Sequence, residues 1–216
     1  MRLSSLDARR GGTVNVLTRS LEPEEAPTPV AGEGDERALM ARVGMGDAKA
    51  FERIVARHLP MLHALAWRML GDASEAEDVV QESLVKLWVN AKGWQPSGGG
   101  LGAWLRRIAT NACLDRLRRP RTLSDEALPE RADETPLADA LIDTERRRVA
   151  VQAAILSLPD RQRAAIVLTY HEGVSNAEAA SILGIGVKAL ESLLVRARQG
   201  LSQQLARQGL MQGVAA

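Results

Sequence analysis

Apolar residues recur three and four positions apart along most of the chain, which is the period of amphipathic α-helices. The pattern begins at Asp35 and continues to about residue 120, with Gly44-Met45-Gly46 separating a first helix from a second. Pro60 is expected to kink or restart the second helix, because proline removes one backbone donor and clashes with the preceding turn. The first half of the chain therefore predicts an all-helical module.

Two further helices are expected in this module, separated by a segment too rich in glycine to be regular, residues 93–102. The helix at residues 75–92 is expected to bury one apolar stripe, formed by Val80, Leu84, Leu87 and Trp88. Its opposite or flanking surface carries Asp78, Gln81, Glu82 and Lys86. A polar helix face of this kind favours docking on another protein over binding a small ligand, which requires an apolar pocket.

The next helix runs from residue 103 to 119 and stops at Pro120. Its buried stripe is predicted to contain Trp104, Leu105, Ile108, Ala109 and Ala112. At 3.6 residues per turn, Arg107, Asn111 and Arg118 fall within about 40° of one another. Guanidinium and amide groups on one face suit contacts with phosphates and bases, although an arginine-rich face is also common on helices that are only solvated.

Residues 174–199 have the pattern of a helix-turn-helix. Ser175 and Glu178 form a capping box, and Gly184-Ile185-Gly186 breaks the first helix before a second begins at Val187. One side of the second helix is apolar, with Leu190, Leu193, Leu194 and Ala197. The other side carries Lys188, Glu191, Ser192, Val195, Arg196 and Gln199. Such a free face suits insertion into a DNA major groove, but an ordinary helical hairpin has the same pattern.

Charge is distributed unevenly along the 216 residues, although the formal net charge is only +1. Residues 101–121 are basic, and residues 121–143 are acidic and contain two prolines, which predicts an interdomain linker. Residues 1–34 lack a sustained period and are expected to form a disordered tail. The basic segment suits nucleic acid, whereas the acidic one would be repelled by it.

Catalytic and metal chemistry find little support in the residues. Cys113 is the single cysteine, so no intrachain disulfide can form, and no histidine has a metal-ligand spacing. No nucleophile–base pair and no phosphate-cradling loop is present. There is no apolar run near the ~20 residues of a membrane helix and no signal peptide. We therefore expect a cytoplasmic protein that is not an enzyme, has no cofactor or small-molecule substrate and does not insert into a membrane.

Several motifs together resemble the extracytoplasmic-function group of bacterial RNA polymerase sigma factors. In the first module they are A-F-E-R-I-V-A-R-H, A-E-D-V-V-Q-E-S-L and A-W-L-R-R-I-A-T-N-A-C-L-D-R-L-R-R. In the second they are L-P-D-R-Q-R-A-A-I-V-L, Y-H-E-G-V-S-N-A-E-A-A-S-I-L-G and S-L-L-V-R-A-R. Their order and separations match over roughly residues 36–120 and 145–205.

The resemblance implies an all-α chain with two small domains. Residues 35–120 would be sigma region 2, residues 121–143 a flexible acidic linker, residues 144–206 sigma region 4, and residues 207–216 a flexible tail. The implied partners are core RNA polymerase, promoter DNA and an anti-sigma protein. By this resemblance Asp78, Gln81 and Glu82 would bind the polymerase. The −10 element would be bound by Leu101, Arg107, Asn111 and Arg118, and the −35 element by Lys188, Glu191, Ser192, Val195 and Arg196.

Two positions depart from the family's usual pattern. Leu101, expected in the loop before A-W-L, stands where the family usually has an aromatic ring, and Glu191 stands where a basic residue is frequent. A carboxylate can accept from cytosine N4 but repels phosphate, so −35 specificity is expected to differ. A two-domain regulator that binds DNA without polymerase, and uses its first module for dimerisation or ligand binding, is the alternative function.

Overall fold

The computed structural model describes residues 33–96, 99–119 and 139–208, and every regular element within these ranges is helical. The first module consists of α2 (Glu33–Val43), α3 (Ala48–Leu70), α4 (Ala73–Asn90), η1 (Ala91–Gly93) and α5 (Gly100–Arg118). The second consists of α6 (Asp139–Leu156), α7 (Asp160–Ile166), η2 (Val167–His171), α8 (Asn176–Leu183) and α9 (Val187–Arg207). The predicted all-α class with two helical domains is confirmed.

Helix α3 is the centre of the first module and packs against α2, α4 and α5. Its N-cap is Asp47, whose Oδ1 accepts from the Ala50 N–H at 3.1 Å. It ends at Gly71, whose φ of 71° is the left-handed conformation that terminates helices. Pro60 lies within α3, and the helix does not restart there. Buried residues on both sides of Pro60, including Ile54 and Leu62, explain how packing holds the helix together across the proline.

The second module contains the predicted helix-turn-helix. The Ser175 hydroxyl caps α8 by accepting from the Glu178 N–H at 3.2 Å. Gly184 ends α8 with a φ of 62°, and the Ile185 N–H donates to the Ala180 carbonyl at 3.0 Å, which turns the chain into α9. Leu190, Leu194 and Ala197 are buried, so the predicted apolar side of α9 packs inward.

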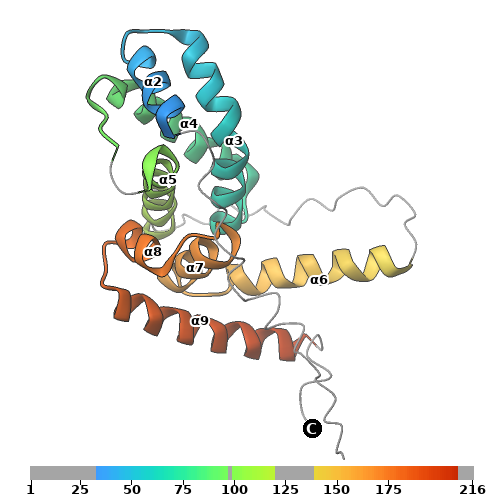
Figure 1. Cartoon of the computed structure of the whole chain (residues 1–216). Coiled ribbons are helices and arrows are strands. Elements are labelled where there is room, and N and C mark those ends of the chain that lie inside the picture. The colour runs from blue at the N-terminus through green and yellow to red at the C-terminus, as the bar shows by residue number, and fades with distance from the viewer. Residues whose placement is uncertain (1–32, 97–98, 120–138, 209–216) are drawn as a thin grey trace, which may run out of the picture.

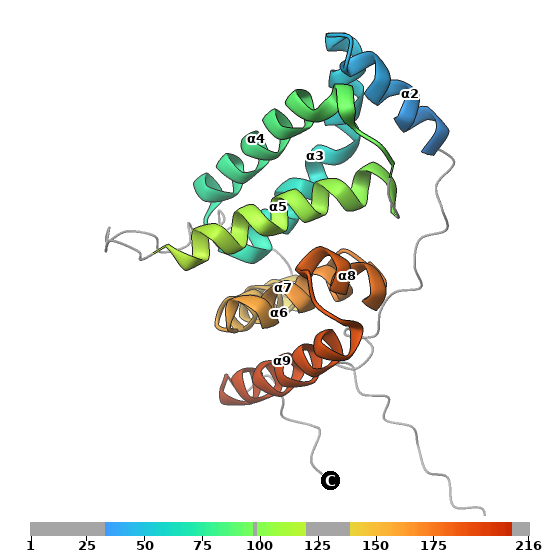
Figure 2. The ribbon, with the colours of Figure 1, turned by 90° about the vertical axis from the view of Figure 1, so that its left-hand side faces the viewer.

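The two modules pack directly against each other, which the interpretation of two domains on a flexible linker did not anticipate. Helix α5 contacts α7 and α8, and α3 contacts α6, α7 and η2. In Figure 2 the chain forms a stack, with α4 and α5 above α7 and α8, and with α9 on the far side. Figure 1 shows α6 projecting sideways from this stack.

Domain boundaries differ slightly from the predicted ones. Helix α6 begins at Asp139, inside the predicted linker 121–143, and α2 begins at Glu33, inside the predicted tail. The predictions for residues 1–32, for most of the linker (121–138) and for residues 209–216 lie outside the described residues. Residues 97 and 98 of the glycine-rich segment also lie outside them.

Candidate nucleic-acid interface

Helix α9 presents a continuous polar face to solvent. The five side chains predicted to contact the −35 element are all exposed: Lys188, Glu191, Ser192, Val195 and Arg196. They lie opposite the buried leucines because residues three and four apart share a face of a helix. In Figure 1, α9 lies at the edge of the molecule, away from the first module.

Hydrogen bonds along α9 orient part of this face. The Ser192 hydroxyl donates to the Lys188 carbonyl at 3.0 Å, and Arg196 Nε donates to the Ser192 carbonyl at 3.2 Å. The Nε contact holds the first part of the Arg196 side chain along the helix and leaves its terminal amino groups at the outer end. Two parallel N–H groups at that position suit the O6 and N7 acceptors of guanine.

Helix α5 carries the polar residues predicted for the −10 element. Arg107, Asn111 and Arg118 are exposed. Arg118 forms an ion pair with Asp115 one turn earlier, and its Nε donates to the Leu114 carbonyl at 3.3 Å. Arg107 and Asn111 lie four residues apart and share one face. The structure therefore keeps the predicted arginines and amide at the surface of one helix.

Leu101 does not have the predicted position. It lies in the first turn of α5, not in a loop, and its side chain is 0% exposed. The helix begins earlier than expected, after Gly99 with its φ of 91°. Leu101 is four residues before the buried Leu105 and so belongs to the same apolar stripe. The predicted loop position of Leu101 is therefore wrong, and its burial does not support the predicted contact with DNA, which stays a prediction.

An open hollow beside α5 was missed by the sequence analysis. It has a volume of about 510 Å³ and is lined by Val89, Asn90, Gly93, Trp94, Gln95 and Trp104. Within the described residues, the buried indole N–H of Trp94 has no hydrogen-bond partner. Aromatic faces in a hollow suit the stacking of an unpaired base. The available signal was that two of only four tryptophans lie within or just after one glycine-rich segment.

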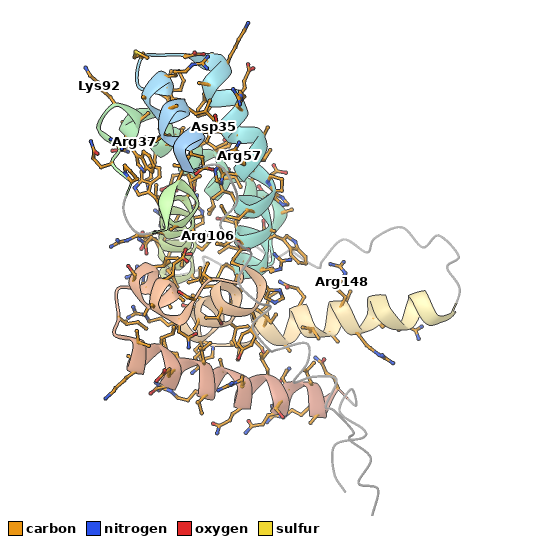
Figure 3. The ribbon with its side chains drawn as sticks, in the orientation of Figure 1. Asp35, Arg37, Arg57, Lys92, Arg106 and Arg148 are labelled. Carbon is orange, nitrogen blue, oxygen red and sulfur yellow. The ribbon has the colours of Figure 1, made fainter. Side chains whose placement is uncertain are left out.

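Two exposed cations on neighbouring elements of the first module were also missed. Arg37 lies on α2 and Lys92 on η1, and these two elements pack together. Figure 3 shows both side chains on the outer side of the first module, where α2 meets η1. Because they are far apart in sequence, no local pattern joins them; only packing brings these charges together.

The three residues predicted to bind core polymerase are not equally exposed. Asp78 and Gln81 are exposed on α4, but Glu82 is half-buried and bridges Lys86 Nζ at 2.7 Å and Arg116 NH1 at 3.0 Å. Hydrogen bonds from Lys86 and then Arg116 hold the pKa of the Glu82 carboxyl below its usual value. Glu82 thus joins α4 to α5 as well as facing solvent.

Exposed apolar residues continue the same face of α4. Val85 is 61% exposed and Val89 is 70% exposed, and they follow Gln81 at spacings of four residues. Trp88, which was predicted to be buried, is 41% exposed and packs edge-on against Phe51 with ring centroids 5.1 Å apart. The face from Asp78 to Val89 is therefore polar at one end and apolar at the other, a combination typical of protein–protein contacts.

Among the described residues, no group of three or more His, Cys, Asp or Glu side chains is placed to hold a metal. Burial raises the pKa of the Cys113 thiol to about 12, so this cysteine is an inert core residue. No helix in the described ranges is long and apolar enough to cross a bilayer.

Comparisons with known proteins match both modules. The family model described as Sigma-70 region 2 matches residues 54–122, and the one described as Sigma-70, region 4 matches residues 148–201. The chain is 34% identical over 194 residues to the ECF RNA polymerase sigma factor SigE of Mycolicibacterium smegmatis, covering 87% of this chain and 71% of SigE.

Two solved structures are similar over both modules. CnrH of Cupriavidus metallidurans, solved in complex with the cytosolic domain of CnrY, has a TM-score of 0.58 and 32% identity over 80% of this chain and 97% of that chain. The sigma factor RpoE of Bartonella quintana, solved in complex with the anti-sigma factor NepR, has a TM-score of 0.58 and 26% identity over 74% of this chain and 98% of that chain.

Proposed function

Because the chain belongs to the extracytoplasmic-function family of RNA polymerase sigma factors, we propose that its two modules divide promoter recognition between α5 and α9. A sigma factor binds core RNA polymerase and directs it to promoters, so the chain is an initiation factor and not an enzyme. In this proposal residues 35–120 act at the −10 element and residues 144–206 act at the −35 element. The observation that carries the division is the exposed polar face of each helix, opposite a buried apolar stripe.

At the −35 element, α9 enters the major groove as the second helix of the helix-turn-helix. Arg196 donates two hydrogen bonds to a guanine, and Glu191 accepts from the amino group of a cytosine. The exposed methyl groups of Val195 contact a thymine methyl, and Lys188 and Ser192 contact backbone or base oxygens. The carboxylate at position 191 is the feature that sets this specificity apart from a helix with arginine there.

At the −10 element, the strand passes across α5 and the hollow beside it. Arg107, Asn111 and Arg118 contact phosphates and base edges. An unpaired base stacks on Trp94 or Trp104, where stacking is worth roughly 1–3 kcal/mol per base. Arg37 and Lys92 add cations for the phosphates on either side of that base. Leu101 has a structural role as part of the buried apolar stripe of α5.

Core polymerase is proposed to bind the exposed face of α4. Asp78 and Gln81 supply polar contacts, and Val85 and Val89 supply the apolar area that is buried on docking. Glu82 takes part only through its outer edge, because its carboxylate is already bonded to Lys86 and Arg116.

An anti-sigma protein is a further proposed partner, supported by the similar sigma factor RpoE, which was solved with its anti-sigma factor NepR. No cofactor and no small-molecule substrate is proposed. The bacterial cytoplasm, where promoter DNA and core polymerase are located, is the proposed site of action.

The test is reconstitution with core RNA polymerase and run-off transcription from genomic fragments. We expect transcripts only when both proteins are present, and promoter binding that changes when the spacer between −35 and −10 is lengthened or shortened. Gel shifts without core polymerase are expected to be weak. Tight and spacing-dependent binding by the chain alone would instead favour the stand-alone regulator.

A further inference from the structure

A buried carboxylate lies between the two modules. Glu172, in the turn after η2, has a side chain only 6% exposed, and its Oε2 accepts from Arg106 Nε of α5 at 3.3 Å. Its Oε1 lies 3.9 Å from Arg68 NH1 of α3. Arg106 NH1 also lies 3.9 Å from Glu178 Oε1 of α8. The guanidinium of Arg106 is therefore held by two carboxylates of the other module.

Backbone and apolar contacts surround this cluster. Arg163 of α7 donates from NH1 to the Met69 carbonyl of α3 at 2.6 Å, so it joins the modules at the end of α3. Leu156 of α6 packs so closely on Gly71 that an added Cβ would meet its Cδ1 at 2.5 Å. The interface is thus a fitted surface in which the Arg106 cluster is the charged part.

This closed arrangement does not match the length of a promoter. Because α5 packs on α7 and α8, which pack on α9, two interhelical layers separate α5 from α9, on the order of 20 Å at 8–10 Å per layer. Elements centred near positions −35 and −10 are about 25 base pairs apart, on the order of 85 Å of B-form DNA at 3.4 Å per base pair. Both helices can reach their elements only after the modules separate.

Separation changes the surroundings of Arg106. It precedes Arg107 on α5, and Figure 3 places it on the part of α5 that faces the second module. Once Glu172 and Glu178 have moved away, its guanidinium is exposed on the surface of α5, about 100° around the helix from Arg107. A guanidinium on that surface is suited to bind a phosphate of the DNA strand.

We propose that Arg106 is a shared cation, which binds Glu172 and Glu178 when the modules are closed and a promoter phosphate when they are open. The proposal rests on the proposed −10 function of α5. In the closed state Arg106 is therefore not available to DNA, and when the interface opens Arg106 joins the −10 surface of α5.

The electrostatics of Glu172 agree with this role. Burial raises the pKa of the Glu172 carboxyl, while Arg106 acts in the opposite direction. When one member of a buried ion pair is removed, the remaining charge destabilises the packed interface, because it has neither water nor a counter-ion around it. Loss of Arg106 or of the two carboxylates should therefore weaken closure in both cases, although only one of these changes leaves a cation for DNA.

The experiment uses the full chain with spin labels at Ser74→Cys and Gln203→Cys, because the native Cys113 is buried and unreactive. Double electron–electron resonance measures the distance between α4 and α9. Fluorescence anisotropy measures affinity for a single-stranded deoxyoligonucleotide of random sequence at several salt concentrations. The variants are Arg106→Ala, Glu172→Gln/Glu178→Gln, and all three changes together. Glu52→Gln/Glu77→Gln is the matched control, since it removes two exposed carboxylates of the first module.

We expect longer distances in all three variants of the cluster and an unchanged distance in the control. Only Glu172→Gln/Glu178→Gln should bind DNA more tightly, by at least about fivefold, a typical lower value for coupled equilibria. Its plot of log affinity against log salt should steepen by about 0.7, the value for one added phosphate contact to a single strand.

Two results would overturn the proposal. If distances in all variants equal the wild-type distance, the cluster does not hold the modules closed. If the triple variant or the charge-matched control shows the same steeper salt dependence, Arg106 is not the phosphate ligand. Circular dichroism and thermal melting verify folding, and Glu178→Gln alone is the milder variant if Glu172→Gln is unstable, since Gln also serves in a capping box. Run-off transcription by the wild type tests the proposed function separately, because the distance measurement requires no DNA.

Discussion

Helices α5 and α9 are both amphipathic and arginine-bearing, but their charged residues have different tasks. On α9 the five residues proposed to contact DNA are exposed, and Ser192 and Arg196 donate hydrogen bonds to the backbone of the same helix; further along, Arg198 donates to the Tyr170 hydroxyl of η2 at 3.3 Å. On α5 the arginines are divided: Arg107 faces solvent, Arg116 bridges Glu75 and Glu82 of α4 at 3.0 Å, and Arg106 binds the second module. Helix α9 thus leaves its proposed DNA-reading face free, whereas α5 is also a structural element of both the bundle and the interface.

The lesson is that a basic helix cannot be assigned to DNA by counting its arginines. The same residue type is a proposed base reader at Arg196, a bridge between helices at Arg116 and a contact between modules at Arg106, according to the carboxylates that the fold places beside it.

The largest effect is expected at the proposed polymerase-docking face of α4, because α5 and α9 both depend on polymerase to act at a promoter. Asp78→Lys should abolish binding to core polymerase and transcription from every promoter, because it reverses the charge of the proposed docking face on α4. Copurification with core polymerase measures it, and Glu52→Lys, on an exposed position of α3, is the matched control. Normal core binding by Asp78→Lys would exclude this face of α4 as the surface that docks on core polymerase.

The next prediction concerns the reading surface of α9. Arg196→Ala should weaken binding by roughly 1–3 kcal/mol at one base pair of the −35 element and relax the preference there. Lys188→Ala should weaken binding to all sequences about equally. The measurement is affinity of the polymerase holoenzyme for promoters carrying each base at each −35 position. A uniform loss for Arg196→Ala would make Arg196 a phosphate contact.

A smaller effect is expected for the bridge on α5. Arg116→Ala should lower the free energy of unfolding by about 1 kcal/mol, since its partners Glu75 and Glu82 are half exposed and such pairs are worth little in water. Arg107→Ala, on the exposed face of the same helix, should leave stability unchanged and weaken DNA binding. Urea denaturation and gel shifts measure the two effects. Equal stability losses would remove the distinction between the two arginines.

The smallest prediction is a pH effect beneath α5. His58 of α3 is buried near Gly102, at the start of α5, and its Nε2 lies 3.0 Å from Glu36. Burial lowers the pKa of the imidazole, and Glu36 acts in the opposite direction. A pKa below the unfolded value means that stability is fully present above about pH 6.5 and is lost as the pH falls further, because the unfolded chain then binds the proton first.

The measurement is urea denaturation of the wild type and His58→Gln between pH 7 and pH 5. The wild type should lose more stability than His58→Gln over this window. If both proteins lose the same free energy of unfolding, the pKa of His58 does not differ between the folded and unfolded states. The pH dependence then comes from other groups.

The sequence by itself determined the helical elements and the division of α9 into two faces. Local rules were sufficient, because the capping box at Ser175, the left-handed Gly184 and the spacing of Leu190 and Leu194 act within a few residues. The exposure of Asp78, Gln81, Arg107 and Asn111 followed from the same helical period.

Only the tertiary structure decided what each charge and ring contacts. Leu101 is buried because α5 begins earlier than its glycines suggested, and the hollow at Trp94 and Trp104 forms where the end of α4 and the segment around Trp94 meet Trp104 of α5. Arg106 and Glu172 are 66 residues apart in sequence, and the helical period relates only residues a few positions apart. Contacts between distant segments depend on how whole faces fit together, so the closing of the two modules could be found only in three dimensions.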